Sequence, residues 1–162
     1  MTARIRDVDR GYKRLMTTMA ELGRARVTVG VHADQGSATH AAAPHGGKAT
    51  PEPVTVVQVA IWNEFGMGVP ERSFLRGWFD GNLQQNQRTI AVMAKSALAG
   101  KRTARDAIEI VGQRFVGELQ RWIADGSHVA PNAPATIRIK GSSTPLVDTG
   151  QLRTSITYLV TS

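Results

Sequence analysis

The sequence predicts a single α+β domain over residues 1–162, with a small antiparallel sheet on which an N-terminal amphipathic helix and two long helices pack. Apolar residues recur at helical spacing through most of the chain. Only two segments, one near each end, show the alternation of a half-buried strand. The sheet must therefore pair segments from opposite ends of the chain, which favours α+β over an alternating parallel fold.

The first helix and the first strand follow each other directly. Apolar residues at steps of three and four predict an amphipathic helix that ends at Gly23, namely Val8, Tyr12, Leu15, Met19 and Leu22. In the segment RVTVGVHA, Val27, Val29 and Val31 share one face, which predicts a half-buried strand.

Residues 34–53 are rich in Gly, Ala, His and Pro and contain almost nothing that can pack. They predict a long loop that orders against a partner during assembly. After it, Val54, Val57, Ile61 and Phe65 follow helical spacing, although the β-branched VTVVQVAIW would also suit a buried strand. Helix is the preferred interpretation, because the segment ends at Gly66.

Two longer helices are expected next. The first runs from about Glu71 to Ala99, and its middle, QQNQRT, is polar all round, which indicates an exposed bridge or a break. The second begins near Ala104, has the most regular apolar spacing in the chain and stops at Asp125-Gly126. A closing strand, SITYLV, is expected to pair with the first strand.

Composition limits the classes of function. Lys and Arg number 20 against 13 Asp and Glu, so the net charge of +7 attracts anions such as nucleic acid or acidic protein surfaces. The chain has no cysteine, which excludes disulfides, thiolate metal sites and a cysteine nucleophile. The sequence predicts neither a membrane-spanning helix nor a secretory signal.

Apparent catalytic motifs have structural explanations. Asp148-Thr149-Gly150 is the tripeptide of an aspartic protease, but only twelve residues follow it, too few for the flanking sheet that this chemistry needs. We therefore expect Asp148 and Thr149 to cap a turn. Gly100 to Thr103 lack the spacing of a phosphate-binding loop, and the four histidines lack metal-ligand spacing. The sequence predicts no enzyme, no cofactor and no metal.

Basic residues form two groups in the sequence. They are Arg4, Arg6, Arg10, Lys13 and Arg14 near the N-terminus, and Arg138 and Lys140 near the C-terminus. Such groups are either a solvated surface or contacts to DNA phosphates or an acidic partner. Nothing in the sequence indicates a motif that reads base edges.

Three segments carry a family resemblance: residues 27–36, residues 59–76 with NEFG followed by PERSFL, and residues 131–160 with TPLVDTGQLRTSI. In this order they resemble the tail-completion (neck, head-to-tail joining) proteins of long-tailed bacteriophages and the related prophage virion-morphogenesis proteins. The residues that carry the resemblance are Asn63, Glu64, Phe65, Gly66, Pro70, Arg72, Phe74, Leu75, Pro145, Leu146, Asp148, Thr149, Gly150 and Leu152.

The resemblance implies a structural virion protein, assembled in the host bacterial cytoplasm, that forms a ring at the phage neck, commonly of six subunits. Its partners would be the head connector (portal, adaptor or stopper) and the tail tube or tail terminator, and the channel would hold DNA. A tail terminator or head-closure protein of the same junction is the first alternative. A basic nucleic-acid-binding accessory protein is the second, and a hydrolase that uses Asp148 is the third.

Several residues carry specific expectations. Phe65 should be buried, and Gly66 should adopt a left-handed helix cap. Arg72, in the first turn of the long helix, should form an ion pair with an acidic residue of its own or of a neighbouring subunit. Leu152 should be a core anchor.

Overall fold

The computed structural model describes residues 9–39, 54–140, 143–146 and 150–161. Its elements are α1 (Tyr12–Arg24), β1 (Arg26–Val31), α2 (Ala33–Gly36), α3 (Val56–Phe65), α4 (Phe74–Gly81), α5 (Leu83–Leu98), α6 (Ala104–Asp125), α7 (Pro134–Lys140), α8 (Gln151–Thr154) and β2 (Ile156–Thr161). The predicted α+β class and the antiparallel pairing of the two terminal strands are confirmed.

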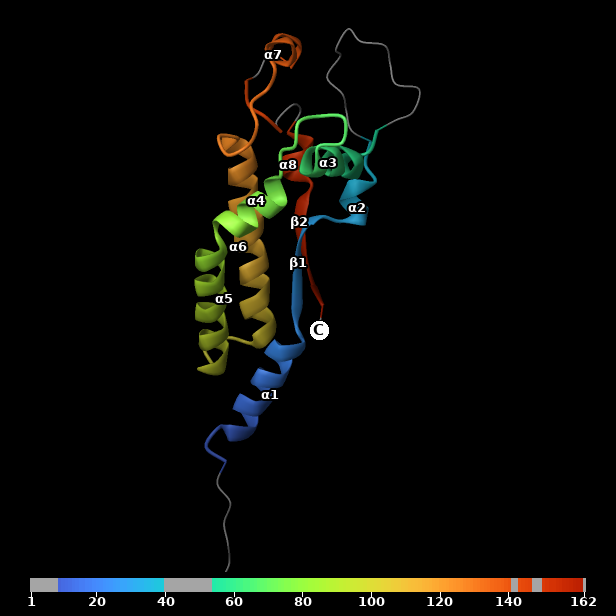
Figure 1. The fold of residues 1–162 in the computed structure, drawn as a ribbon. Coiled ribbons are helices and arrows are strands. Elements are labelled where there is room, and N and C mark those ends of the chain that lie inside the picture. The colour runs from blue at the N-terminus through green and yellow to red at the C-terminus, as the bar shows by residue number, and fades with distance from the viewer. Residues whose placement is uncertain (1–8, 40–53, 141–142, 147–149, 162) are drawn as a thin grey trace, which may run out of the picture.

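The molecule is elongated, with α1 at one end and α3 and α7 at the other (Figure 1). β1 and β2 run side by side in a register that sets Val29 opposite Tyr158. The sheet packs on α6, while α1 and α5 lie against α6 beside it. The long helix α6 is therefore the element that the others share.

The core lies along α6 and beneath α4 and β2. Four large apolar side chains of α6 are buried, and Trp78 of α4 meets one of them, Phe115, edge to face with ring centroids 5.4 Å apart. The predicted anchor Leu152 is buried in the same cluster, which also contains Val56, Phe74, Trp78, Val111, Phe115, Leu119, Ile123, Leu146 and Ile156.

Caps define α3 and α6. At the start of α6, Thr103 and Asp106 exchange side-chain to backbone hydrogen bonds, and the bond from Thr103 lowers the pKa of Asp106. Gly126, at φ 62°, ends α6. The expected turn at residues 100–103 and the expected end of this helix are confirmed.

α1 begins and ends later than the sequence pattern predicts. The carboxylate of Asp9 accepts hydrogen bonds from the amides of Gly11 and Tyr12, so the helix begins at Tyr12; Val8 lies outside the described residues. Gly23 does not end the helix, which continues to Arg24.

The long helix expected over residues 71–99 is two helices. The break lies at Asn82, whose side chain donates to the carbonyl oxygen of Trp78 at the end of α4. The polar stretch QQNQRT is neither a break nor an exposed bridge. It lies within α5. Asn86 and Thr89 are buried there, so polar side chains lie on the side of α5 that faces the rest of the molecule.

The remaining differences concern short segments. Val56–Phe65 form a helix as preferred, begun by a capping box between Thr55 and Gln58. The basic stretch TIRIK belongs to α7, a helix that sequence reasoning did not anticipate. Within the loop expected at residues 34–53, residues 34–36 belong to α2 and Thr39 pairs with Thr55, while residues 40–53 lie outside the described part of the chain.

Close packing of β2 on α6 yields a first prediction. A Cβ atom at Gly112 would lie 2.7 Å from Cγ of Tyr158, so Gly112→Ala should destabilise the fold by about 1–3 kcal/mol. Gly117→Ala is the matched control, because the same helix leaves open space there, and it should raise stability by up to about 1 kcal/mol. Urea unfolding measures both, and equal effects would contradict this packing.

Asn86 yields a second prediction. Neither its Oδ1 nor its Nδ2 has a hydrogen-bond partner among the described residues, although the side chain is 1% exposed. Asn86→Leu removes two buried unpaired polar atoms and should raise the free energy of unfolding by about 1–3 kcal/mol. The exposed Gln87→Leu should change it by less than about 0.5 kcal/mol in the same urea titration.

Candidate functional site

The carboxylate of Glu64, at the end of α3, caps the start of α4. Ser73, at the N-cap position of α4, makes no side-chain cap of its own. Instead, Glu64 accepts hydrogen bonds from the amides of Leu75 and Arg76 at 2.9 and 3.1 Å and from the hydroxyl of Ser73 at 2.9 Å. A buried negative charge thus satisfies the free amides of a helix N-terminus and complements its dipole.

The guanidinium of Arg72 is buried in the loop just before α4. Its Nε donates to the carbonyl oxygen of Ala130 at 2.9 Å, and its two terminal nitrogens donate to oxygens of Asn63, Pro131 and Asn132. Its own amide donates to the carbonyl oxygen of Asn63 at 2.7 Å. Burial lowers the pKa of Arg72, because it removes water from a charged group.

Within the described residues Arg72 pairs with no carboxylate of its own chain, and it does not lie in the first turn of a helix; pairing with a neighbouring subunit stays a prediction. Its partners within the described residues are amide and carbonyl oxygens, all neutral. The reason is that α4 starts two residues later, so the side chain is directed at the segment after α6 rather than along a helix surface.

Asn132 continues this network toward the C-terminal segment. Its Nδ2 donates to the carbonyl oxygens of Ser143 and Thr144 at 3.3 and 3.2 Å, while its Oδ1 accepts from Arg72. We call Asn63, Glu64, Arg72 and Asn132, with the groups they bind, the Arg72 junction. It joins the end of α3, the start of α4, the segment after α6 and the segment before α8.

Phe65 is exposed, so the expectation that it is buried is wrong. Its side chain is 58% exposed, and the guanidinium of Arg76 lies 4.9 Å from the ring centroid. Glu64 takes the inward position because its carboxylate caps α4. The hydrogen bond to Glu64 also raises the pKa of Arg76, with a further contribution from Glu71.

Other residues of the family resemblance have clear positions. Gly66 adopts the predicted left-handed cap at φ 70°, where a Cβ atom would lie 3.2 Å from the backbone of Glu71. Phe74, Leu146 and Leu152 are buried, Leu75 packs against the same cluster, Pro145 is buried beside Gly126, and Pro70 is exposed. Gly150 precedes α8 at φ 76°. Asp148 and Thr149, expected to cap a turn, lie outside the described residues.

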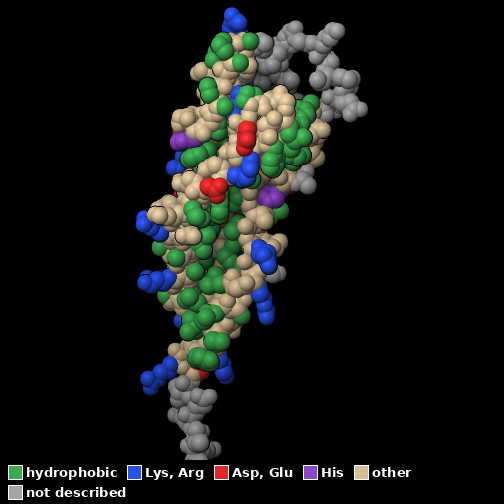
Figure 2. Space-filling view, viewed as in Figure 1, with side chains coloured by type: hydrophobic (Ala, Val, Ile, Leu, Met, Phe, Trp, Pro, Cys, Tyr) green, Lys and Arg blue, Asp and Glu red, His purple; other side chains and the backbone are tan. Residues whose placement is uncertain are grey.

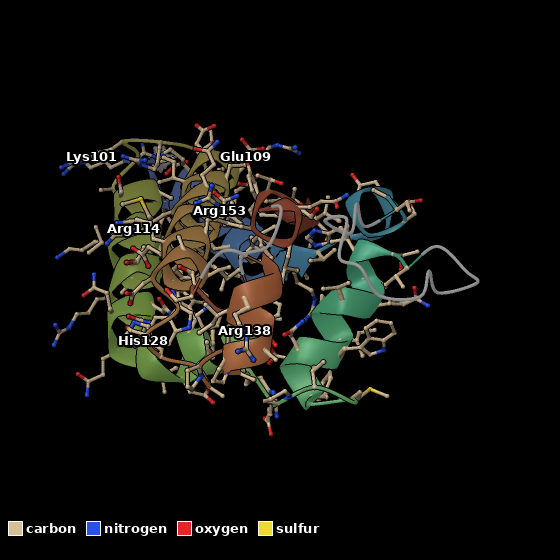
Figure 3. All side chains as sticks on the ribbon, turned by 90° about the horizontal axis from the view of Figure 1, so that it is seen from above. Lys101, Glu109, Arg114, His128, Arg138 and Arg153 are labelled. Carbon is tan, nitrogen blue, oxygen red and sulfur yellow. The ribbon has the colours of Figure 1, made fainter. Side chains whose placement is uncertain are left out.

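The two basic groups of the sequence do not meet. Arg10, Lys13 and Arg14 lie at the α1 end of the molecule, whereas Arg138 lies on α7 at the other end (Figure 1). Figure 3 shows Lys101, Arg114 and Arg138 well apart on different elements. Arg4 and Arg6 lie outside the described residues, as does the side chain of Lys140. The described cations therefore form no single patch.

Histidines serve local contacts. The ring of His32 lies between the hydroxyls of Thr28 and Thr157, at 3.0 and 2.8 Å, and links the two strands. His128 stacks on Trp122 and contacts the carboxylate of Asp125 at 2.6 Å. The described residues contain no group of three potential metal ligands, and none of their helices is long and apolar enough to cross a membrane.

Hydrophobic side chains are exposed on one face of the molecule. Figure 2 shows them along the middle of this face, from the region of α4 down to α1, with a hollow between α5 and β1. Exposed hydrophobic side chains of α1, α4 and α5 include Tyr12, Met16, Met19, Phe79 and Ile90. Such a surface on a small protein indicates contact with another macromolecule.

Sequence reasoning missed the Arg72 junction. It recognised Glu64 and Arg72 as motif residues but not their partners, because Asn132 and Ala130 lie about sixty positions from Arg72 along the chain. One local signal existed: α4 follows a loop whose own residues provide no side-chain cap.

Comparison with protein-family models, curated proteins and solved structures finds no match for this chain.

The junction yields a third prediction. Arg72→Lys keeps the charge but cannot reach acceptors on three sides, so buried oxygens lose their donors, and we expect a loss of about 1–3 kcal/mol of stability. Arg153→Lys, on the exposed surface of α8, should leave the melting temperature unchanged. Thermal melts followed by circular dichroism measure both, and a fully stable Arg72→Lys protein would show that the junction does not hold the fold.

Proposed function

We propose that this chain is a structural virion protein that forms a ring at the neck of a bacteriophage and joins the DNA-filled head connector to the tail. The proposal starts from the family resemblance of residues 27–160. The ring would contain several copies of the chain, six being the number that the resemblance implies. The head connector proteins and the tail tube or tail terminator would be its neighbours.

One observation supports the proposal above the others. The motif residues from separate parts of the chain meet in one place, where Arg72 and Glu64 join segments whose apolar neighbours, including Phe74, Leu146 and Leu152, lie in a common core. The positions of these motif residues support a role in one architecture rather than in a reaction. A protein whose distinctive residues shape its own fold and whose surface is apolar suits an assembly role.

The basic charge fits the same role. A net charge of +7 on each copy would be multiplied around a ring, and such a ring would attract DNA in its channel or acidic neighbouring proteins. The described cations are spread over both ends of the molecule instead of lining one groove. This distribution favours a ring with charged surfaces over a protein that grips nucleic acid as a single subunit.

The fourth prediction is the test of this function. Phage particles made without the chain should accumulate as full heads and complete tails that do not join, visible by electron microscopy. A plasmid copy should restore joined particles. Complementation with Leu152→Asp should fail, because it buries an unpaired charge, whereas Leu159→Asp, at a half-exposed position of β2, serves as the folded control.

Other outcomes identify the alternatives. Tails of irregular length without the chain would indicate a tail terminator, and heads that lose their DNA would indicate a head-closure protein. Normal infectious particles would overturn a virion role altogether. A salt-dependent gel shift by the isolated chain, with particles unaffected by its loss, would point to a nucleic-acid-binding accessory protein.

A further inference from the structure

An apolar groove runs between β1 and α5, with α6 as its floor. Its upper part has a volume of about 410 Å³ and its lower part about 270 Å³, and Val27 and Ile90 line both. Phe79 and Trp78 border the upper end near α4, and Leu22 borders the lower end near α1. The groove therefore extends along most of the body of the molecule.

Helix α1 carries an apolar face that no other described part of the chain covers. Tyr12, Met16 and Met19 lie at positions i, i+4 and i+7, so they share one side of the helix. Their side chains are 68, 48 and 52% exposed, and no residue of α1 is buried. α1 contacts α5 and α6 but buries no residue there, and a helix of 13 residues is marginal in water on its own, so a partner on this face would stabilise it.

The groove and the apolar face of α1 look in the same direction, as Figure 2 shows. α1 cannot enter the groove of its own chain, because Leu22 already forms the lower end of that groove. Because the groove and the apolar face of α1 lie on the same side of the molecule, each can contact the other on a second copy only if that copy is rotated by about half a turn. The result is a closed dimer with two-fold symmetry.

Charge distinguishes a second copy from other occupants. Lys13 lies beside the apolar face of α1, near the end of the helix that is farthest from the body (Figure 1). Asp80 lines the upper end of the groove, and its carboxylate has no ion pair or hydrogen bond within the described part of the chain. Arg76 lines the same end but is already paired with Glu64 and Glu71. A half turn brings the α1 end of one copy to the α4 end of the other. Lys13 of each copy then lies near Asp80 of the other, which gives two contacts between opposite charges.

We infer that this face binds the same face of a second copy, with each α1 packed in the groove of the other and Lys13 next to the partner's Asp80. The pair does not depend on the neck assignment. A ring would need contacts between unlike patches, so it would use other surfaces of the chain.

The fifth prediction follows from the pair. Sedimentation equilibrium of the full chain at low concentration should detect a species with twice the mass of one copy. Met16→Asp and Ile90→Asp, both on half-exposed sites of the face, should each weaken pairing by about tenfold or more, because they place a charge in the apolar contact. Val92→Asp is the matched control: it is 59% exposed on α5 but lies outside the groove, and it should pair like the wild type.

Two charge reversals test the arrangement itself. Asp80→Lys and Lys13→Glu should each pair with themselves about tenfold more weakly, because like charges then meet at both contacts. An equal mixture of the two variants restores an opposite pair at each contact and should recover wild-type affinity. A monomeric wild type, unchanged pairing of Met16→Asp, or a mixture no tighter than either variant alone would overturn the inference. None of these outcomes bears on head-to-tail joining.

Discussion

The buried guanidinium of Arg72 is the interaction on which the rest of the structure depends. The partly buried carbonyl of Ala130 and the buried side-chain oxygen of Asn132 follow the end of α6, and both accept hydrogen bonds from Arg72. Arg alone among side chains offers five donors in a rigid fork, so one residue can serve acceptors on α3 and after α6 together. Burial removes water from the guanidinium, which is unfavourable for its charged form and lowers the pKa of Arg72. The hydrogen bonds to the surrounding oxygens offset this loss of hydration.

The Arg72 junction also positions the C-terminal strand for pairing in the sheet. The Arg72 junction holds Asn132, and Asn132 holds the segment at Ser143 and Thr144 that leads to α8 and β2. β2 can then pair with β1 from the other end of the chain. Two strands alone are marginally stable, and here α6 supplies the missing layer by accepting the ring of Tyr158 at Gly112.

Sequence alone predicted what local patterns determine. α6 was predictable because large apolar residues set its period and Thr103 and Gly126 mark its ends. The two strands and the cap at Gly66 were predictable for similar reasons. The break at Asn82 was not, because it depends on a side chain that turns back to α4, and the buried Asn86 has the polarity of an exposed residue.

The site was predictable only as a set of residue types. Hydrophobicity places Phe65 inside and Glu64 outside, and the structure reverses them. Four donors at the start of α4, from Ser73, Leu75 and Arg76, bind the carboxylate of Glu64, while the guanidinium of Arg76 lies over the ring of Phe65. The partners of Arg72 are equally distant in sequence. Interactions of this kind become visible only when the fold brings the donors and acceptors together.

Folding and assembly use separate parts of this molecule. The Arg72 junction is buried and polar, and it fixes how one chain closes on itself. The apolar face of α1 contributes no buried side chain, so substitutions there leave the junction and the core around α6 intact. A chain organised in this way can change which surfaces it presents to other copies without changing its fold, and its exposed apolar side chains are then explained by association rather than by defects of packing.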